Sequence, residues 1–275
     1  MTDPNEPLSR IADALQRLAP APENVTDWRS APAYLWTGAE GRAMARIEAP
    51  SLALLKGIDR QKATVVENVK RLAAGHAAHD MLLWGARGMG KSALVRAAVL
   101  AAQAEASGRL ALVQAGTASL DTLPLLFAVL GEVDRGFLVY IDDLGFAEED
   151  THGPRHLRSW LEGGIEARPA NVRLAVTSNR RAIVPRQMSE QDDPINPRDA
   201  VDDRLALADR FGLALGFHAC SQDEYLAIVR GYAAEYGLDW NEAGALEWAQ
   251  RRGARSGRVA WHYVVELAGR AGKLI

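Results

Sequence analysis

The glycine-rich stretch GARGMGKS at 85–92 constrains the fold of this 275-residue chain more than any other feature. It matches the pattern G-x-x-x-x-G-K-[ST] and stands between a short apolar run, MLLW, and a helical stretch, SALVRAAVLAAQAEA. Glycines let a backbone curl so that successive N–H groups face one anion, and a helix N-terminus adds partial positive charge. The sequence therefore predicts a strand, a phosphate-binding loop (P-loop) and a helix, in that order.

The end of this loop predicts its chemistry. A lysine and a hydroxyl, Lys91 and Ser92, are the residue types that neutralise β- and γ-phosphate oxygens and ligate Mg²⁺ in such loops. We therefore expect ATP and Mg²⁺ as ligands. The residues expected to bind the nucleotide here are Gly85, Ala86, Arg87, Gly88, Met89, Gly90, Lys91, Ser92 and Ala93.

A second apolar run ends in two aspartates, in FLVYIDDL. Asp142 is expected at the C-terminal end of a buried strand, beside the P-loop, where it would hold the Mg²⁺ shell. Asp143 stands where many hydrolysing relatives of this architecture carry a glutamate that orients the attacking water. Because aspartate is shorter by one methylene, both efficient and slow hydrolysis stay open. The plain alternative is an acidic pair that merely ends a strand.

Short apolar runs recur through the middle of the chain, at 81–84, 110–113, 137–141, 172–177 and 213–217. Their alternation with helical segments is typical of a parallel sheet covered on both faces, a doubly wound α/β core. After Ser221 the pattern is helical only, and Ser221 with Glu224 forms a capping-box signature. We expect three regions: a partly helical N-terminal appendage over 1–50, the α/β core over 51–219 and a small helical domain over 220–275.

Composition restricts the cellular compartment that we expect for the protein and the partners that it could bind. The formal net charge of -3 and a pI near 6.1 argue against a broad basic surface for nucleic acid, although a local patch stays open. The single cysteine, Cys220, cannot form an internal disulfide. No apolar stretch is long enough for a membrane span, and the N-terminus is polar. We expect a cytoplasmic protein.

Further polar residues follow the order found in AAA+ ATPases. Asn179, at the end of VRLAVTSN, resembles the sensor-1 residue, and Arg258, in RSGRVAWHYV, resembles sensor-2 of the helical lid. Arg210, in LALADRFGLALGF, resembles the arginine finger that reaches a neighbouring subunit's ATP. Arg204 is a second candidate for the arginine finger, and Arg255 is a second candidate for sensor-2. The plain alternative is a polar residue that ends a strand for Asn179, and a surface ion pair for Arg210 or Arg204.

The resemblance narrows to one group of proteins. LLKGIDRQKATVVENVKRLAAGHAAHDMLLWGARGMGKS, YIDDLGF, WLEGGIEARPANVRLAVTSNRR and LADRFGLALGF together look like a bacterial family of AAA+-type ATP-binding proteins of unknown function, over roughly Leu52 to Leu267. This resemblance implies an AAA+ fold with a five-stranded core and a helical lid, and ATP binding with hydrolysis. By the same analogy Ile58 would border the adenine. The resemblance implies no substrate.

Three functions stay open. The first is an ATPase that assembles into a homo-oligomer with ATP and remodels or loads a protein or nucleic-acid partner. The second is a nucleotide-dependent switch or scaffold that hydrolyses ATP slowly, which Asp143 in place of glutamate favours. The third, a small-molecule kinase, would need an acceptor site that the sequence does not indicate. His152 and His156 are spaced as metal ligands could be, but Gly153 and Pro154 favour a loop.

Overall fold

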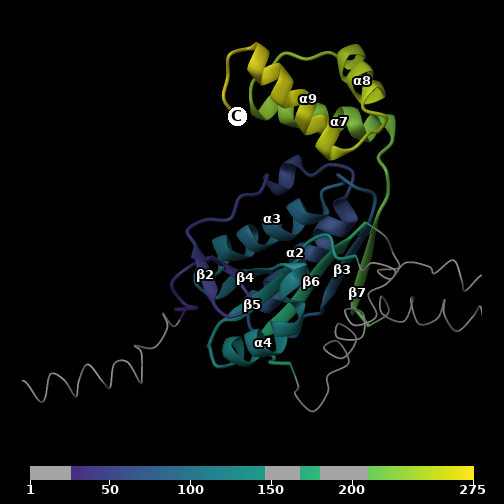
Figure 1. The fold of residues 1–275 in the computed structure, drawn as a ribbon. Helices are drawn as coiled ribbons and strands as arrows, with labels where there is room; N and C mark the ends of the chain where they lie inside the picture. The colour runs from purple at the N-terminus through teal and green to yellow at the C-terminus, as the bar shows by residue number, and fades with distance from the viewer. Residues whose placement is uncertain (1–25, 146–167, 180–209) are drawn as a thin grey trace, which may run out of the picture.

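The computed structural model describes residues 26–145, 168–179 and 210–275, and these form a helix-covered sheet with a further layer of helices (Figure 1). The sheet has the strand order β2-β1-β4-β5-β6-β3-β7. All neighbouring strands run parallel except β1 and β2. The strands are β1 Ala33–Trp36, β2 Gly41–Met44, β3 Met81–Gly85, β4 Leu110–Ala115, β5 Gly136–Ile141, β6 Val172–Ser178 and β7 Leu213–Phe217.

The five predicted strands are present as β3 to β7, but the expected five-stranded sheet is corrected to seven strands. The two further strands come from residues that we assigned to an appendage. β1 pairs in parallel with β4, and the Trp36 indole donates a hydrogen bond to Thr122 Oγ1 at 2.8 Å. The buried Arg135 guanidinium bonds the carbonyls of Trp28 and Ala31, each at 2.9 Å. These contacts attach the segment to the core. Residues 1–25 of the expected appendage lie outside the described residues.

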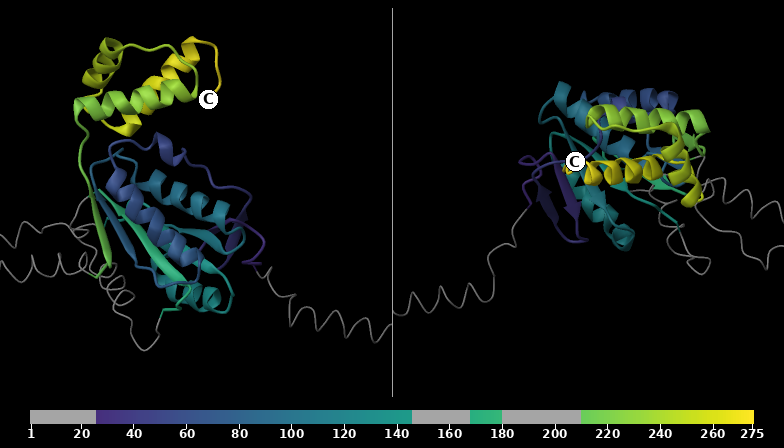
Figure 2. Two further views of the ribbon diagram at one scale, coloured as in Figure 1. Left: turned by 180° about the vertical axis from the view of Figure 1, so that it is seen from behind. Right: turned by 90° about the horizontal axis from the view of Figure 1, so that it is seen from above.

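Helices cover both faces of the sheet, as Figure 2 shows. α2 (Asp59–Ala73) and α3 (Lys91–Glu105) pack on one face, and α4 (Leu123–Gly131) packs on the other. The sheet therefore has a hydrophobic core on each face, because successive side chains of a strand point to opposite faces. In β5, Leu138 and Tyr140 face α3, while Val139 faces α4. Two 3-10 turns, η1 (Leu52–Leu54) and η2 (Thr117–Thr122), complete this region.

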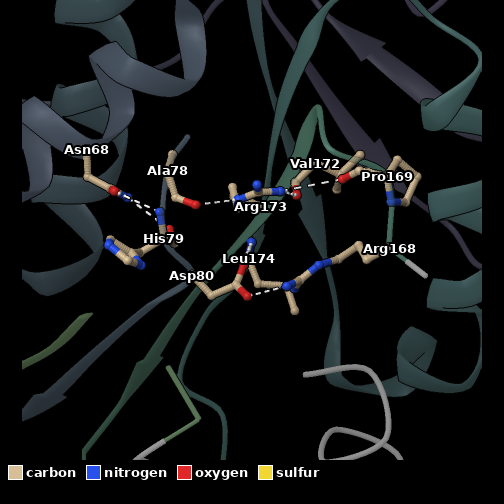
Figure 3. Close-up of polar contacts among 9 residues, drawn as sticks. All are labelled: Asn68, Ala78, His79, Asp80, Arg168, Pro169, Val172, Arg173 and Leu174. Carbon is tan, nitrogen blue, oxygen red and sulfur yellow. Dashed lines mark hydrogen bonds and ion pairs between the residues drawn. The ribbon is translucent and has the colours of Figure 1, made fainter. Parts of the chain in front are cut away.

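A polar network closes the N-terminal ends of β3 and β6 (Figure 3). Asp80, just before β3, accepts the Leu174 N–H at 2.8 Å and forms an ion pair with Arg168. Arg173 Nε donates to the Ala78 carbonyl at 2.5 Å. Because β3 and β6 run parallel, their N-terminal ends lie at one edge of the sheet and their C-terminal ends at the other. The network therefore lies at the edge opposite the P-loop, which follows the C-terminal end of β3.

Three helices follow β7: α7 (Gln222–Glu235), α8 (Glu242–Arg251) and α9 (Gly257–Arg270). The predicted capping box is confirmed, since Glu224 N–H donates to Ser221 Oγ at 3.2 Å and Ser221 N–H donates to Glu224 Oε2 at 2.7 Å. These helices lie beyond the α3 side of the sheet (Figure 1). Within the described ranges, no helix is long and apolar enough to cross a bilayer.

Candidate nucleotide-binding site

The GARGMGKS stretch joins β3 to α3, as predicted, and its first residue must be glycine. Gly85 has φ 120°, and a Cβ placed on it would lie 2.1 Å from the backbone oxygen of Phe217 in β7. The next residue, Ala86, donates its N–H to the same Phe217 oxygen at 2.7 Å. β7 therefore holds the start of the loop at a separation that no side chain would permit.

Lys91 begins α3 and is buried. Its Nζ donates to the carbonyls of Gly85 and Ala86, at 2.8 and 2.9 Å, and to Asn179 Oδ1 at 3.3 Å. Burial lowers the Lys91 pKa below its ordinary value, while the charges of Asp143 and Asp142 act in the opposite direction. The ammonium is thus held over the loop by oxygens that a phosphate could replace.

Three hydroxyls surround the Asp142 carboxylate at the end of β5. Ser92 Oγ and Thr177 Oγ1 each donate to Asp142 Oδ1 at 2.7 Å. Burial raises the pKa of Asp142, but the hydroxyls of Tyr140, Thr177 and Ser92 outweigh it and leave that pKa below its usual range. Burial also raises the pKa of Tyr140. The predicted pair of Ser92 and Asp142 is thus brought together, with the oxygen ligands that Mg²⁺ prefers.

Asp143 has a backbone conformation that is uncommon for a residue with a side chain, φ 51°. Its N–H donates to Thr177 Oγ1 at 2.8 Å, and Asn179 Nδ2 donates to its carboxylate. Asn179 thereby links Lys91 to Asp143 through the two ends of one amide. The predicted polar residues after β5 and β6 form one connected group.

A cleft of about 840 Å³ opens between the P-loop and the C-terminal helices. Its polar part contains Lys91, Ser92, both aspartates and Asn179. Its apolar part is formed by two regions far apart in the sequence: Leu54 and Leu55 at the end of η1, and aromatic residues from α7 and α9. The Trp261 ring centroid lies 5.1 Å from that of Tyr232 and 5.8 Å from that of Tyr236. The cleft therefore offers a charged end and an aromatic end.

The other predicted residues fall into two groups. Arg258 lines the cleft, and its N–H donates to the Gly88 carbonyl at 3.1 Å, which joins α9 to the P-loop. Ile58 is buried below the loop near Gly90 instead of lining the cleft. Arg210 precedes β7, at the sheet edge opposite the P-loop, so it lies outside this chain's own cleft.

The remaining loop residues take different places. Arg87, Gly88, Met89, Gly90 and Ala93 line the cleft, whereas Gly85 and Ala86 contribute the carbonyls that hold Lys91. Among the competing arginines, Arg255 is exposed and Arg204 lies outside the described residues, as do His152 and His156.

Sequence reasoning missed several residues of the cleft. Thr177 is in β6 and Asn179 directly follows that strand, two residues later, so strand alternation would have placed both side chains on one face. Arg96 lines the cleft four residues after Ser92, one helical turn along α3. Tyr232 and Trp261 gave no signal, because their place depends on how α7 and α9 pack over the core.

The strand order and the loop between β3 and α3 define the class, a P-loop α/β protein of the AAA+ fold. The structure is similar to the RuvB Holliday junction branch migration motor of Thermotoga maritima, with a TM-score of 0.50 and 16% identity, covering 81% of this chain and 66% of that one. It is also similar to the ORC2 protein of Aeropyrum pernix in ADPNP–ADP complexes, with a TM-score of 0.54 and 14% identity, covering 82% of this chain and 66% of that one. The chain therefore spans just under two thirds of the length of these proteins.

The family is narrower than this class. A family described as a protein of unknown function, DUF815, matches residues 29–271, and the chain belongs to it. The predicted resemblance to AAA+-type proteins of unknown function is thereby confirmed. No curated protein matches the sequence.

Proposed function

We propose that this protein binds ATP with Mg²⁺ in the cleft and hydrolyses it. The observation that carries the proposal is the convergence of Lys91, Ser92 and Asp142 at one loop, with Ser92 Oγ 2.7 Å from Asp142 Oδ1. Gly88 and Gly90 have φ 73° and 86°, which fits a loop whose successive backbone N–H groups turn toward one anion. Two oxygen ligands beside it fit a hard cation.

The residues divide the work as follows. The loop N–H groups and Lys91 bind the phosphates, and Ser92 with Asp142 holds the cation. When bound, Mg²⁺ neutralises charge on the phosphate oxygens. Asp143 and Asn179 orient the attacking water. The aromatic end, formed by residues such as Tyr232 and Trp261, takes the adenine, because flat apolar surfaces bind bases by stacking.

The C-terminal helices act as a lid in this proposal, and a second subunit completes the site. Arg258 approaches the γ-phosphate from α9, since it already lines the cleft and bonds the loop. Arg210 serves as an arginine finger for a neighbouring copy, because it lies at the opposite sheet edge from its own P-loop. ATP would then bridge subunits of a homo-oligomer. Hydrolysis would drive assembly or remodelling of a protein or nucleic-acid partner.

A slow nucleotide-dependent switch is the second candidate. The observation that favours it is the hydrogen bond from Asn179 to the Asp143 carboxylate, which occupies the group that should orient water. Single-turnover measurements discriminate the two. Hydrolysis on the order of 1–100 s⁻¹ supports a motor, and turnover several orders of magnitude slower supports a switch.

Calorimetric titration with ATP tests the binding site. Lys91→Ala removes the ammonium group that binds the phosphates. We expect the affinity for ATP to fall by about 100-fold or more, since charged hydrogen bonds contribute about 1.5–3 kcal/mol each. The matched control is Lys70→Ala, on the exposed surface of α2, which should leave affinity unchanged. Tight ATP binding by Lys91→Ala would contradict the site.

A further inference from the structure

One hydroxyl lies between both aspartates of the site. Thr177 Oγ1 donates to Asp142 Oδ1 at 2.7 Å and accepts the Asp143 N–H at 2.8 Å. A hydroxyl carries one donated proton and two acceptor lone pairs, so both bonds can form at once. Thr177 is buried on β6, where its side chain has little freedom to turn away.

The same strand end also fixes the backbone that follows β5. Asp143 has φ 51°, in the left-handed region that residues with a Cβ seldom adopt. Such a conformation persists where the surroundings determine it several times over. Here Leu144 N–H donates to the Thr177 carbonyl at 2.7 Å, in addition to the bond from Asp143 N–H to Thr177 Oγ1. Thr177 therefore holds the turn through its backbone and its side chain.

We propose that Thr177 is a positioning residue that sets Asp142 for the Mg²⁺ shell and Asp143 for water through one hydroxyl, a role that rests on the proposed function. Removing the hydroxyl deletes one bond to Asp142 and leaves the Asp143 N–H without the acceptor that holds it. Both aspartates then lose a contact that fixes their position, so we expect the two carboxylates to move together. Neither Ser92 nor Asn179 makes both of these contacts.

The test compares Thr177→Val, which keeps the shape, with Thr177→Ser, which keeps the hydroxyl. ATP affinity in EDTA, the Mg²⁺ concentration at half-maximal effect on nucleotide binding, and kcat and KM are measured for each. For Thr177→Val we expect affinity in EDTA and KM within about twofold of wild type. Mutation of a residue that orients a metal ligand typically lowers metal affinity or activity by about 10- to 100-fold. For Thr177→Val we therefore expect the Mg²⁺ midpoint to rise, and kcat to fall, by about 10- to 100-fold.

Thr177→Ser should return both values to within about threefold of wild type, because the hydroxyl can still bond both aspartates. Thr64→Val is the control, since Thr64 Oγ1 donates to the Arg60 carbonyl of its own helix α2 at 3.0 Å, and it should behave as wild type. Circular dichroism establishes folding of each variant. Should Thr177→Val not fold, Thr177→Ala replaces it in the comparison with serine.

The outcomes separate this role from the proposed function. Thr177→Val with a wild-type Mg²⁺ midpoint overturns the positioning role, and so does a serine variant as defective as valine. A wild type that binds no ATP overturns the proposed function and this role together. If the wild type binds Mg²⁺ and ATP but shows no turnover, the Mg²⁺ midpoint of Thr177→Val alone decides whether Thr177 positions the aspartates.

Discussion

Asp143 is the residue on which the rate of the site depends. Its carboxylate is bonded by Asn179, and its backbone is left-handed. Asparagine adopts this conformation more readily than most residues, so Asp143→Asn should fold normally while losing its negative charge. Loss of a group that orients or deprotonates water lowers rates by about 10²- to 10⁴-fold. We expect such a fall in turnover with ATP affinity unchanged.

The measurement is single-turnover hydrolysis at saturating Mg²⁺, with ATP binding followed by calorimetry. Asp143→Glu provides the comparison, since it restores the charge on a side chain longer by one methylene. Turnover by Asp143→Asn equal to that of the wild type would remove Asp143 from catalysis.

The contact between α9 and the P-loop can be tested through one glycine. Gly88 has φ 73°, and a Cβ on it would lie 2.9 Å from Ser256 Oγ and 3.0 Å from Arg258 Cβ. Gly88→Ala should therefore displace the start of α9 and weaken ATP binding, in addition to the backbone strain of about 1–2 kcal/mol. Calorimetry and thermal unfolding measure the two effects separately.

Gly108→Ala is the matched control for this change. Gly108 has a nearly identical φ of 76°, yet nothing lies within 4 Å of an added Cβ. Both variants should lose the stability that backbone strain costs, Gly88→Ala should lose more because of its close contacts with α9, and only Gly88→Ala should lose ATP affinity. Equal affinity in the two variants would show that the approach of α9 to the loop is not needed for binding.

The elements differ in how far the sequence predicts them. β3, β4 and β5 are recognisable because each contains a short apolar run that is buried on both faces, as LALV in β4 is. β6 and β7 are also mainly apolar, although β6 includes Arg173 and β7, at the edge of the sheet, is only partly buried. β1 was missed because AYLW is short and stands in a segment rich in proline and tryptophan. Its place depends on pairing with β4 and on the bond between Trp36 and Thr122, which are 86 positions apart. No local pattern encodes such a contact.

The candidate site shows the same division. Lys91, Ser92 and Asp142 follow from local patterns, because a strand end and a helix start fix where each side chain can point. Tyr232 and Trp261 could not be predicted, since they line one cleft with Leu54 only after the C-terminal helices pack over the core. The charged end of the cleft is therefore encoded locally, and its aromatic end is encoded by tertiary packing.

In the proposed function, hydrolysis by an assembly of several copies depends on Arg210. It lies before β7, and its own P-loop lies at the other end of β3, so the proposed finger must act on another copy. Turnover should then rise with protein concentration, and Arg210→Ala should lose about 10³- to 10⁵-fold in kcat while still binding ATP. Arg109→Ala is the control, because Arg109 is exposed at the same sheet edge, just before β4.

Mixing two inactive variants gives the sharpest test of this arrangement. Lys91→Ala retains Arg210 but loses its own phosphate contact, and Arg210→Ala retains an intact P-loop. A mixed assembly places the Arg210 of one variant against the P-loop of the other, so turnover should reappear only in the mixture. Recovery that requires both proteins and rises with the concentration of either one means that the arginine acts between subunits. A mixture as inactive as its parts, with assembly demonstrated by light scattering, means that Arg210 has no role in a neighbour's site.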